Sequence, residues 1–455
     1  MPTRPALAAP LALLLILPAA AALADLDPSE LRVSVPLAPP PEGPHGVPGA
    51  ATAALFEGEV RVTSTPQWQN EPALAVNPLN PDNLIAGSND YHYHGNGGFV
   101  WVGLYTSHDG GDSWSEQPLP GTGGLTNPVG GVLPYPSAGD PIMAFDGLGT
   151  AYAGGIDFQG GQSWIFVSAS PDGGDTWLQP TFPGGALSGF GFQDKPDMAG
   201  DPTLPLAHVC WTDFGLPAIV AAAGAAGAWT PIVPISEVGP VQGCSIAVGG
   251  DSSVYVAYMR YSGCLSCGGS LKFTKAAPGG VGWSTPSTIV ATQSVSGANF
   301  RINGFPSLAV DESGGASDGD LYVVWTDNRA GSADVWLVKS TDAGATWSAP
   351  TRVNQDPGTA GQFQAAVAVG PDGKVHVTFY DTRLGGGYTY WGATSEDGGA
   401  TWRERPMASA PTPPTASAGF LGDYTDLQVG SDGVAHAVWA DGRTGDQDLW
   451  VRNFG

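Results

Sequence analysis

The sequence predicts an all-β fold built from repeated units of four short strands. Three observations lead to this expectation. An eight-residue pattern, Ser-x-Asp-x-Gly-x-x-Trp, occurs at 107–114, 170–177, 340–347 and 395–402. Short strand patterns recur at intervals of roughly 50–60 residues, as in repeat architectures. Finally, the 455 residues include Gly 67 and Pro 41, and no sustained helical period with caps follows the N-terminus, so turns outnumber helices.

The eight-residue pattern has the composition of a tight hairpin turn. Ser and Asp side chains can hydrogen-bond nearby backbone amides, and Gly supplies a left-handed backbone position. The closing Trp starts the next strand and buries a large ring. The residue before this Trp is Ser or Thr in all four copies. The chain has Trp 15, which agrees with repeats that each need a packing ring.

The strand pattern divides the chain into seven units. Second strands often end in aromatic-x-Asp, as at 211–213, 325–327, 379–381 and 439–441. The third strand leads into the Ser-Asp-Gly turn, and the fourth begins at its Trp. Units three and four keep only that position, as Trp229 and Trp283. The first strands begin near Ala73, Ile142, Pro196, Ser245, Ser307, Ala366 and Thr425.

The two ends of the chain are predicted to meet. The seventh unit runs out after its third strand, 449–453, and a lone strand pattern surrounds Val60. Pairing these two segments completes the seventh unit and removes an exposed sheet edge. We therefore predict a single seven-bladed β-propeller over residues 56–455. Six blades is the alternative if unit three or four is miscounted.

The four turns resemble those of the Asp-box (bacterial neuraminidase repeat) β-propellers, the sialidase-like superfamily. This resemblance spans almost the whole chain after the N-terminal segment. In that family the boxes lie on the outer rim, so they identify the fold strongly and the function weakly. The resemblance implies a glycan-directed protein, an exo-α-sialidase-type glycoside hydrolase. The alternative is a non-catalytic propeller that binds a glycan or a protein. Sialidases themselves have six blades.

The N-terminus predicts export. Residues 1–24 combine Arg4, an apolar run and an Ala-Leu-Ala cleavage site at 22–24, which is typical of a signal peptide. Residues 25–55 form a Pro-rich linker. We expect a secreted protein, extracellular or periplasmic, with no membrane span. In that setting Cys210, Cys244, Cys264 and Cys267 favour two disulfides at blades three and four over a zinc site.

Charge narrows the classes of partner. The formal net charge is −25, whereas binding nucleic acid or anionic lipid requires a basic face. We therefore expect a glycan or glycoconjugate partner, no nucleic acid, and a monomer. No cofactor is predicted. A calcium ion held by loop carboxylates is left open, because such a site has no specific signature here.

Ligands of propellers bind at the channel mouth, where first strands begin and second strands end. The sialidase resemblance implies a Tyr nucleophile activated by a Glu, and an Asp as acid/base. Tyr424 and Glu71 are the candidates for the first pair, because blades seven and one become neighbours on closure. Asp90 and Asp140 are further catalytic candidates. Another glycosidase type, which uses two carboxylates, would draw on Asp90, Asp140, Asp194 or Asp197. Residues expected at this face are Glu71, Asn89, Asp90, Asp140, Asp194, Lys195, Asp197, Arg260, Tyr261, Arg301, Gln364, Asp423 and Tyr424.

The resemblance also implies three arginines that bind a sugar carboxylate. The family's Phe/Tyr-Arg-Ile-Pro motif has its nearest match at 300–303, which ends in Asn and lies in unit five. Arg301 is therefore the first candidate, with Arg260 and Lys195 beside it. Arg329, Arg383 and Arg443 each follow a strand-ending Asp by two residues. They are predicted either to bind substrate or to form a repeated Asp–Arg bridge. Their spread round the ring favours the bridge.

Overall fold

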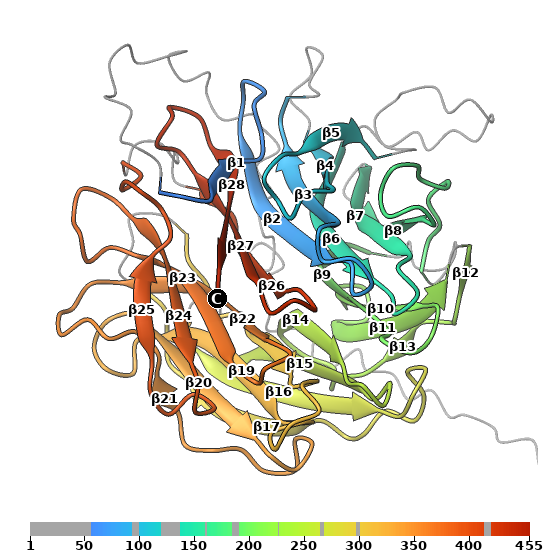
Figure 1. The fold of residues 1–455 in the computed structure, drawn as a ribbon. Helices are drawn as coiled ribbons and strands as arrows, with labels where there is room; N and C mark the ends of the chain where they lie inside the picture. Colours follow the sequence, from blue (N-terminus) through green and yellow to red (C-terminus); the bar gives the residue numbers. More distant parts are fainter. Residues whose placement is uncertain are drawn as a thin grey trace, which may run out of the picture. The chain divides into compact units, whose positions relative to one another are not determined.

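Seven antiparallel sheets surround a central axis (Figure 1). The structure, a computed structural model, describes residues 56–92, 100–119, 137–159, 162–183, 191–225, 227–263, 268–296, 301–413 and 420–455. Every regular element in these ranges is a β-strand. The predicted signal peptide and linker lie outside them. The innermost strands of successive sheets contact one another in a complete circle, the last returning to the first.

The sheets follow the chain as consecutive blades. Blade one contains β2 (Gln69–Val76), β3 (Leu84–Asp90), β4 (Trp101–Ser107) and β5 (Ser115–Pro118). Blade two contains β6 (Ser137–Phe145), β7 (Ala151–Gln159) and β8 (Gln162–Ser170). Blade three contains β9 (Gln193–Gly200), β10 (Ala207–Asp213) and β11 (Ala218–Ala225), with β12 (Ala228–Trp229) and β13 (Val233–Pro234) both paired to β11.

The second half of the ring is more regular. Blade four contains β14 (Val241–Val248), β15 (Val254–Tyr261), β16 (Gly269–Ala276) and β17 (Ser287–Thr292). Blade five contains β18 (Ser307–Val310), β19 (Leu321–Asp327), β20 (Asp334–Ser340) and β21 (Thr351–Arg352). Blade six contains β22 (Gln362–Val369), β23 (Val375–Asp381), β24 (Thr389–Ser395) and β25 (Arg403–Pro406).

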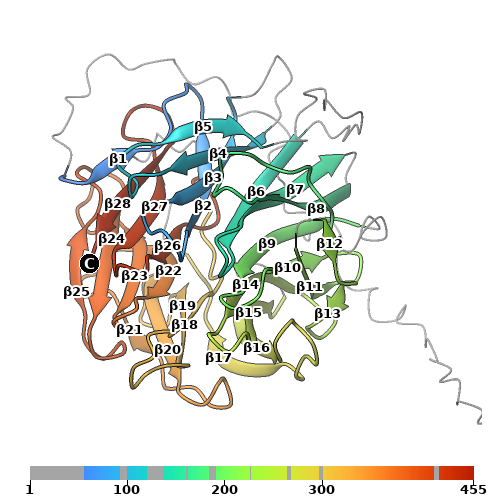
Figure 2. The ribbon, with the colours of Figure 1, turned by 45° about the vertical axis from the view of Figure 1, so that its right-hand side comes forward.

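Blade seven is assembled from both ends of the described chain. Its sheet has the order β1-β28-β27-β26, with β26 (Asp426–Val429), β27 (Ala435–Asp441), β28 (Asp448–Phe454) and β1 (Glu59–Arg61). Strand β1 lies beside β28 (Figure 2), and Val60 pairs with Val451 in their register. The Arg61 guanidinium contacts Asp448 at 2.6 Å, and the Leu449 amide donates to Thr63 Oγ1 at 3.0 Å. The predicted seven blades and ring closure are confirmed, and the six-blade alternative is wrong.

The hydrophobic core lies between blades. Each cluster of buried side chains joins residues from neighbouring blades; one combines Phe363 and Tyr390 of blade six with Trp439 and Phe454 of blade seven. The Trp of the aromatic-x-Asp pattern is fully buried at Trp211, Trp325 and Trp439. The aromatic residue of this strand-ending pattern therefore marks a position where a large ring fills the space between two sheets.

The four Ser-Asp-Gly turns share one hydrogen-bond pattern. In the turn at 395–402, Ser395 Oγ donates to Asp397 Oδ1 at 2.8 Å and accepts from the Gly399 amide at 2.8 Å. Asp397 also accepts from the backbone and side chain of Thr401. The same bonds recur at Asp109, Asp172 and Asp342. The residue types at the repeated positions are thus those that close the turn.

Cys210 of β10 and Cys244 of β14 form a disulfide between blades three and four. One of the two expected disulfides is therefore present; Cys264 and Cys267 lie outside the described residues. Within the described ranges no helix is long and apolar enough to span a membrane.

Candidate functional site

Five inner strands carry the same irregularity near their first residues. Each has a β-bulge, and the bulged residue adopts a left-handed backbone conformation: Glu71 (φ 52°), Asp140 (φ 51°), Lys195 (φ 48°), Gly243 (φ 64°) and Gln364 (φ 52°). This conformation is uncommon for residues other than glycine. Bulges re-aim side chains, and here they direct charged and polar groups of different blades toward one place.

Lys195 lies at the centre of a cluster of buried charges. Its Nζ is 2.9 Å from Asp140 Oδ2, 2.8 Å from Asp423 Oδ2 and 3.3 Å from Glu71 Oε1. The Lys195 side chain is only 7% exposed. Three blades besides its own hold it, because blades one, two and seven each supply one carboxylate. A buried ammonium is stable only with such paired and hydrogen-bonded partners.

Arg301 adds a second cation above Asp423. Its guanidinium binds both carboxylate oxygens of Asp423, with Nε at 2.9 Å from Oδ1, and its side chain is 37% exposed. Asn303 donates to the Asp423 backbone oxygen at 2.8 Å. We call Glu71, Asp140, Lys195, Arg301 and Asp423 the hub cluster.

Further hydrogen bonds fix the carboxylates of the hub cluster. Glu71 Oε2 accepts from Asn89 at 2.6 Å, and Glu71 Oε1 accepts from the Asp423 amide at 2.9 Å. The same Asn89 side chain accepts from the Asp140 amide at 2.7 Å. Behind Lys195, Asp194 accepts from Gln242 at 2.7 Å. Blades one, two, three, four and seven are thereby tied together at the hub.

Burial and neighbouring charges shift the pKa values of these groups in different directions. Burial raises the pKa of Glu71 to about 8, partly opposed by Lys195. Burial also raises the pKa values of Asp140 and Asp194. For Asp423, the charges of Lys195 and Arg301 outweigh burial and lower the pKa. Burial acts to lower the pKa of Lys195, but the surrounding carboxylates, Asp140 first, raise it well above its usual range.

Aromatic rings border the cluster. Lys195 Nζ lies 5.4 Å from the ring centroid of Tyr424, and the Arg301 guanidinium lies 4.7 Å from that of Phe420. Both rings are half-buried. Burial raises the pKa of Tyr424 well above its usual range, with Asp140 and Glu71 adding to the effect. Exposed ring faces beside charged groups are a common setting for polar ligands.

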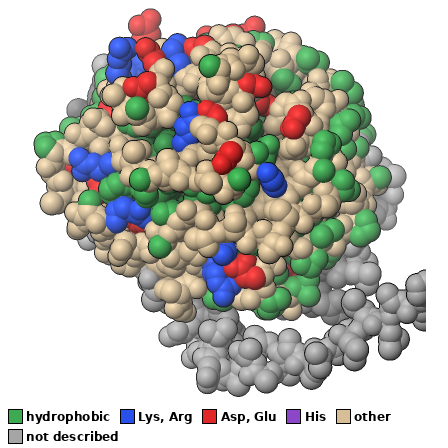
Figure 3. Space-filling view, turned by 90° about the horizontal axis from the view of Figure 1, so that it is seen from below, with side chains coloured by type: hydrophobic (Ala, Val, Ile, Leu, Met, Phe, Trp, Pro, Cys, Tyr) green, Lys and Arg blue, Asp and Glu red, His purple; other side chains and the backbone are tan. Residues whose placement is uncertain are grey.

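A cavity of about 370 Å³ runs along the axis from the hub cluster. Its walls are the inner strands of all seven blades, with mostly apolar side chains, of which Ala and Val are the most frequent. Lys195, Gln364, Asp423 and Tyr424 line it at the hub end. We call this space the axial cavity. The face seen from below in Figure 3 carries scattered acidic and basic side chains, with no continuous patch of one sign.

Half of the predicted site residues converge. Glu71, Asp140, Lys195 and Arg301 belong to the hub cluster, and Tyr424 borders it. Ring closure brings these residues together although they lie far apart in the sequence.

Asp90 and Arg260 have partners elsewhere. Asp90 is buried and accepts hydrogen bonds from Gln69, Tyr105 and the His92 amide. Arg260 pairs with Glu237 at 3.2 Å, in blade four. The side chains of Asp90 and Arg260 are therefore paired outside the hub cluster in this structure.

The structure does not bring Arg329, Arg383 and Arg443 together with Arg301. Each binds the carboxylate two residues before it, namely Asp327, Asp381 and Asp441. Each also stacks on a Trp of its own blade: Trp325 and Trp336, Trp391, and Trp450. This geometry is that of the repeated Asp–Arg bridge.

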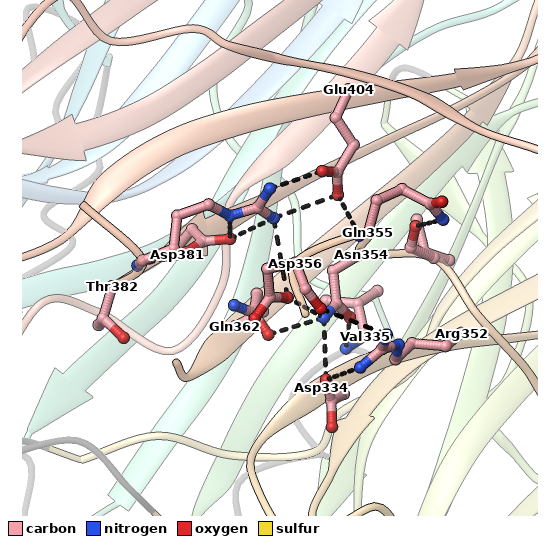
Figure 4. Close-up of polar contacts among 12 residues, drawn as sticks. Asp334, Val335, Arg352, Asn354, Gln355, Asp356, Gln362, Asp381, Thr382 and Glu404 are labelled. Carbon is pink, nitrogen blue, oxygen red and sulfur yellow. Dashed lines mark hydrogen bonds and ion pairs between the residues drawn. The ribbon is translucent and has the colours of Figure 1, made fainter. Parts of the chain in front are cut away.

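Around Arg383 the bridge extends into a larger network. Its guanidinium also contacts Glu404 at 2.6 Å. Figure 4 shows Asp381 and Glu404 on one side of this network, and Asp356, Asn354 and Asp334 on the other. Asn354 donates to Asp334, Asp356 and Gln362 at 2.7–2.8 Å. These bonds link blades five and six, which is a structural role.

Sequence reasoning missed two contributions to the site. Asp423 was expected at this face without a role, yet it binds both cations of the hub cluster. Phe420 and Asn303 were not singled out at all. Asp423 directly precedes Tyr424, the candidate nucleophile, and this adjacency could have indicated it.

No group of three or more His, Cys, Asp or Glu side chains within the described ranges has the arrangement of a metal site.

No protein-family model matches this sequence, and no curated protein matches it. Solved structures share the fold at low identity. An α-L-arabinanase of Penicillium chrysogenum complexed with arabinobiose is 16% identical, with a TM-score of 0.49 over 88% of this chain and 98% of that chain. The leech intramolecular trans-sialidase is 14% identical, with a TM-score of 0.43 over 87% and 69%. The six-bladed Aleuria aurantia lectin is 12% identical, with a TM-score of 0.46 over 78% and 100%. At these identities the likeness concerns the fold alone.

Proposed function

We propose that this protein is a glycan-directed β-propeller that binds a sugar unit at the mouth of the axial cavity. The observation that carries this proposal is the hub cluster, a convergence of buried charges beneath Phe420, Tyr424 and the half-exposed Arg301. Sugars offer hydroxyl groups to charged hydrogen-bond partners and apolar ring faces to aromatic side chains. Convergent polar groups with perturbed pKa values also favour a functional site.

The contacts of the cluster support a ligand without a carboxylate. A sialidase-type site needs arginines that are available to the sugar acid, but Asp423 already binds Arg301 through two hydrogen bonds. Tyr424 Oη has no hydrogen-bond partner, and both oxygens of Glu71 accept from other donors. The phenol thus lacks a base beside it. A sialidase-type site is what the sequence resemblance implies. It requires Arg301 to leave Asp423, and Glu71 to leave its present donors, when the ligand binds.

Hydrolysis by two carboxyl groups is a second candidate. The pKa of Glu71 rises to about 8, whereas that of Asp423 falls. A proton held on one carboxyl near an ionised neighbour is the division of roles that glycoside hydrolysis uses. In this candidate Glu71 protonates the leaving oxygen, and Asp423 or Asp140 stabilises the charge that develops on the sugar.

Binding is tested by titrating the purified chain against a panel of immobilised neutral, amino and acidic glycans. We expect at least one glycan to bind, and Phe420→Ala to weaken it about tenfold through the loss of ring contact. Leu79→Ala is the matched control, because Leu79 is 67% exposed and follows the end of β2 that is far from the hub. If no glycan binds, or if both variants behave alike, the proposed function is wrong.

Hydrolysis is tested with fluorogenic neutral glycosides and a fluorogenic sialoside. Two-carboxylate catalysis predicts turnover of a neutral substrate that is lost in Glu71→Gln and kept in Tyr424→Phe. Sialidase-type catalysis predicts turnover of the sialoside that is lost in Tyr424→Phe. A protein that binds glycans and turns over neither substrate is a binding propeller.

A further inference from the structure

Two polar atoms at the mouth of the axial cavity have no hydrogen-bond partner among the residues that the structure describes. They are Gln364 Oε1 and Tyr424 Oη, both buried. Gln364 is 4% exposed, and its amide nitrogen donates to the Gly422 carbonyl, which leaves the oxygen as an acceptor facing no donor. Both residues line the cavity. A buried acceptor without a donor is destabilising, so a ligand that supplies the donor regains that free energy.

The wall below this mouth carries two further carboxyl groups. Asp197 of blade three and Asp426 of blade seven line the cavity. Burial raises the pKa of Asp197 to about 7 and that of Asp426 to about 6, and the charge of Asp426 adds to the rise at Asp197. Each accepts a backbone N–H of the next blade, Ile246 or Leu74, at 2.8 Å. No cation among the described residues pairs with either.

The hub and cavity together hold more carboxyl groups than cations. Lys195 and Arg301 are the two cations, and Lys195 already has three carboxylate oxygens within 3.3 Å. The carboxyl groups are Glu71, Asp140, Asp194, Asp197, Glu312, Asp423 and Asp426. A positive group in this low-dielectric cavity favours the ionised form of these carboxyls and is attracted by it, whereas a negative group is repelled.

We infer that the mouth of the axial cavity takes an ammonium group, so that the ligand is an amino sugar with a free amine. This inference rests on the proposed function and names its ligand class. An ammonium has three donors and no acceptor, which matches the acceptor Gln364 Oε1 and a lone pair of Tyr424 Oη. Acetylating the amine removes the charge and two donors, and a sugar carboxylate brings the wrong sign.

The experiment is calorimetric titration of the full chain with three probes. These are a glucosamine trisaccharide, its fully N-acetylated form, and sialyllactose. We expect the glucosamine trisaccharide to bind about tenfold more tightly than the N-acetylated form, and the acidic sugar to bind weakest. The preference should shrink as salt is added, because it is electrostatic.

Two variants locate the preference. Gln364→Leu removes the unpartnered acceptor, and Asp426→Asn removes a charge of the cavity wall while keeping an acceptor oxygen for the Leu74 amide. Each should weaken the glucosamine probe several-fold more than the N-acetylated probe. Asp175→Asn is the matched control, since its side chain is 61% exposed on the turn at 170–177.

The outcomes separate the inference from the proposed function. If none of the three probes and no glycan of the panel binds, the proposed function fails. If the N-acetylated or the acidic probe binds as tightly as the glucosamine trisaccharide, the ligand class is wrong while the proposed function stands. Thermal unfolding checks that each variant is folded. Even if a variant does not fold, the order of the three probe affinities on the unaltered chain still tests the ligand class.

Discussion

Lys195 is the single residue on which the hub depends most. Its ammonium balances carboxylates from blades one, two and seven at distances of 2.8–3.3 Å. Removing one partner from a buried ion network leaves uncompensated charge, which costs far more than the network contributes relative to apolar packing. The stability of the hub should therefore respond sharply to this position.

We expect Lys195→Met to lower the free energy of unfolding by about 3–5 kcal/mol at pH 7, measured by denaturant titration. Lys374→Met is the control. Its ion pair with Asp372 is exposed, with side-chain exposures of 36% and 45%, so its loss should cost less than about 1 kcal/mol. Equal effects of the two substitutions would contradict the role given to Lys195.

Asp157 is a buried carboxyl group without a hydrogen-bond partner. It lies near the end of β7 and is 1% exposed, and neither of its oxygens has a partner among the described residues. Burial raises its pKa from 3.8 to about 8. The folded state thus keeps a proton that the unfolded state releases above about pH 4. Stability from this group is present at low pH and is lost as the pH rises toward 8.

Asp157→Asn should therefore have little effect on stability at pH 4–5 and should stabilise the protein by about 1 kcal/mol or more at pH 8. The measurement is the free energy of unfolding of both proteins across this pH range. A constant difference over the whole range would show that the carboxyl is not the titrating group.

The equivalent position in blade five predicts the opposite sign. Asp327 also ends a second strand, but it binds Arg329 and Trp325, and Arg329 lowers its pKa although burial opposes this. Asp327→Asn should destabilise the protein by about 1–3 kcal/mol at neutral pH. The same residue type at the same strand position thus differs in effect because only one copy has a cation beside it.

At the scale of residues, the sequence predicted which residues lie near the hub better than it predicted the contacts that they make. Tyr424 and Glu71 were paired because closure makes blades seven and one adjacent, and the structure brings both to the hub. The left-handed bulges at Glu71, Asp140 and Lys195 were not predictable, because those residue types rarely adopt that conformation. The spread of Arg329, Arg383 and Arg443 round the ring favoured the Asp–Arg bridge, and this is the arrangement in the structure.

Among the elements, the Ser-Asp-Gly turns are the ones that the sequence described most fully. The Ser and Asp side chains of the repeated pattern make the bonds that close the turn. Blades three and four lack the pattern yet still form sheets. Packing between blades stabilises their strands, so a blade still forms where the Ser-Asp-Gly pattern is lost.

Ser395→Ala tests this account of the turn. The Ser395 side chain is buried, donates to Asp397 and accepts from the Gly399 amide. Its removal should lower the free energy of unfolding by about 1–3 kcal/mol. Glu396→Ala changes an exposed side chain of the same turn and should have little effect. A similar loss in both variants would mean that the buried hydroxyl does not stabilise the turn.

For the whole molecule, the decisive feature is closure of the ring. β1 joins the described chain's beginning to β28 near its end, and Glu59 and Arg61 form ion pairs with Arg443 and Asp448. The sequence predicted this pairing from a missing fourth strand. It could not fix the strands of every blade: blade two has three, with a single bridge between Val167 and Thr181 where a fourth would lie.

A chain that starts at residue 66 should unfold at a markedly lower denaturant concentration than one that starts at residue 56. The shorter chain lacks β1 and Thr63, which leaves β28 as an open edge and the carboxylate of Asp448 without Arg61. Equal midpoints for the two chains would contradict a stabilising role for closure.

Hydroxyl-radical footprinting with the bound glycan tests most directly whether the hub is where this propeller meets its ligand. The account predicts that a saturating glycan protects Phe420 and Tyr424, and leaves Trp114, Trp177, Trp347 and Trp402 of the four turns unchanged. Protection at those turns, with Phe420 and Tyr424 as reactive as before, would contradict it.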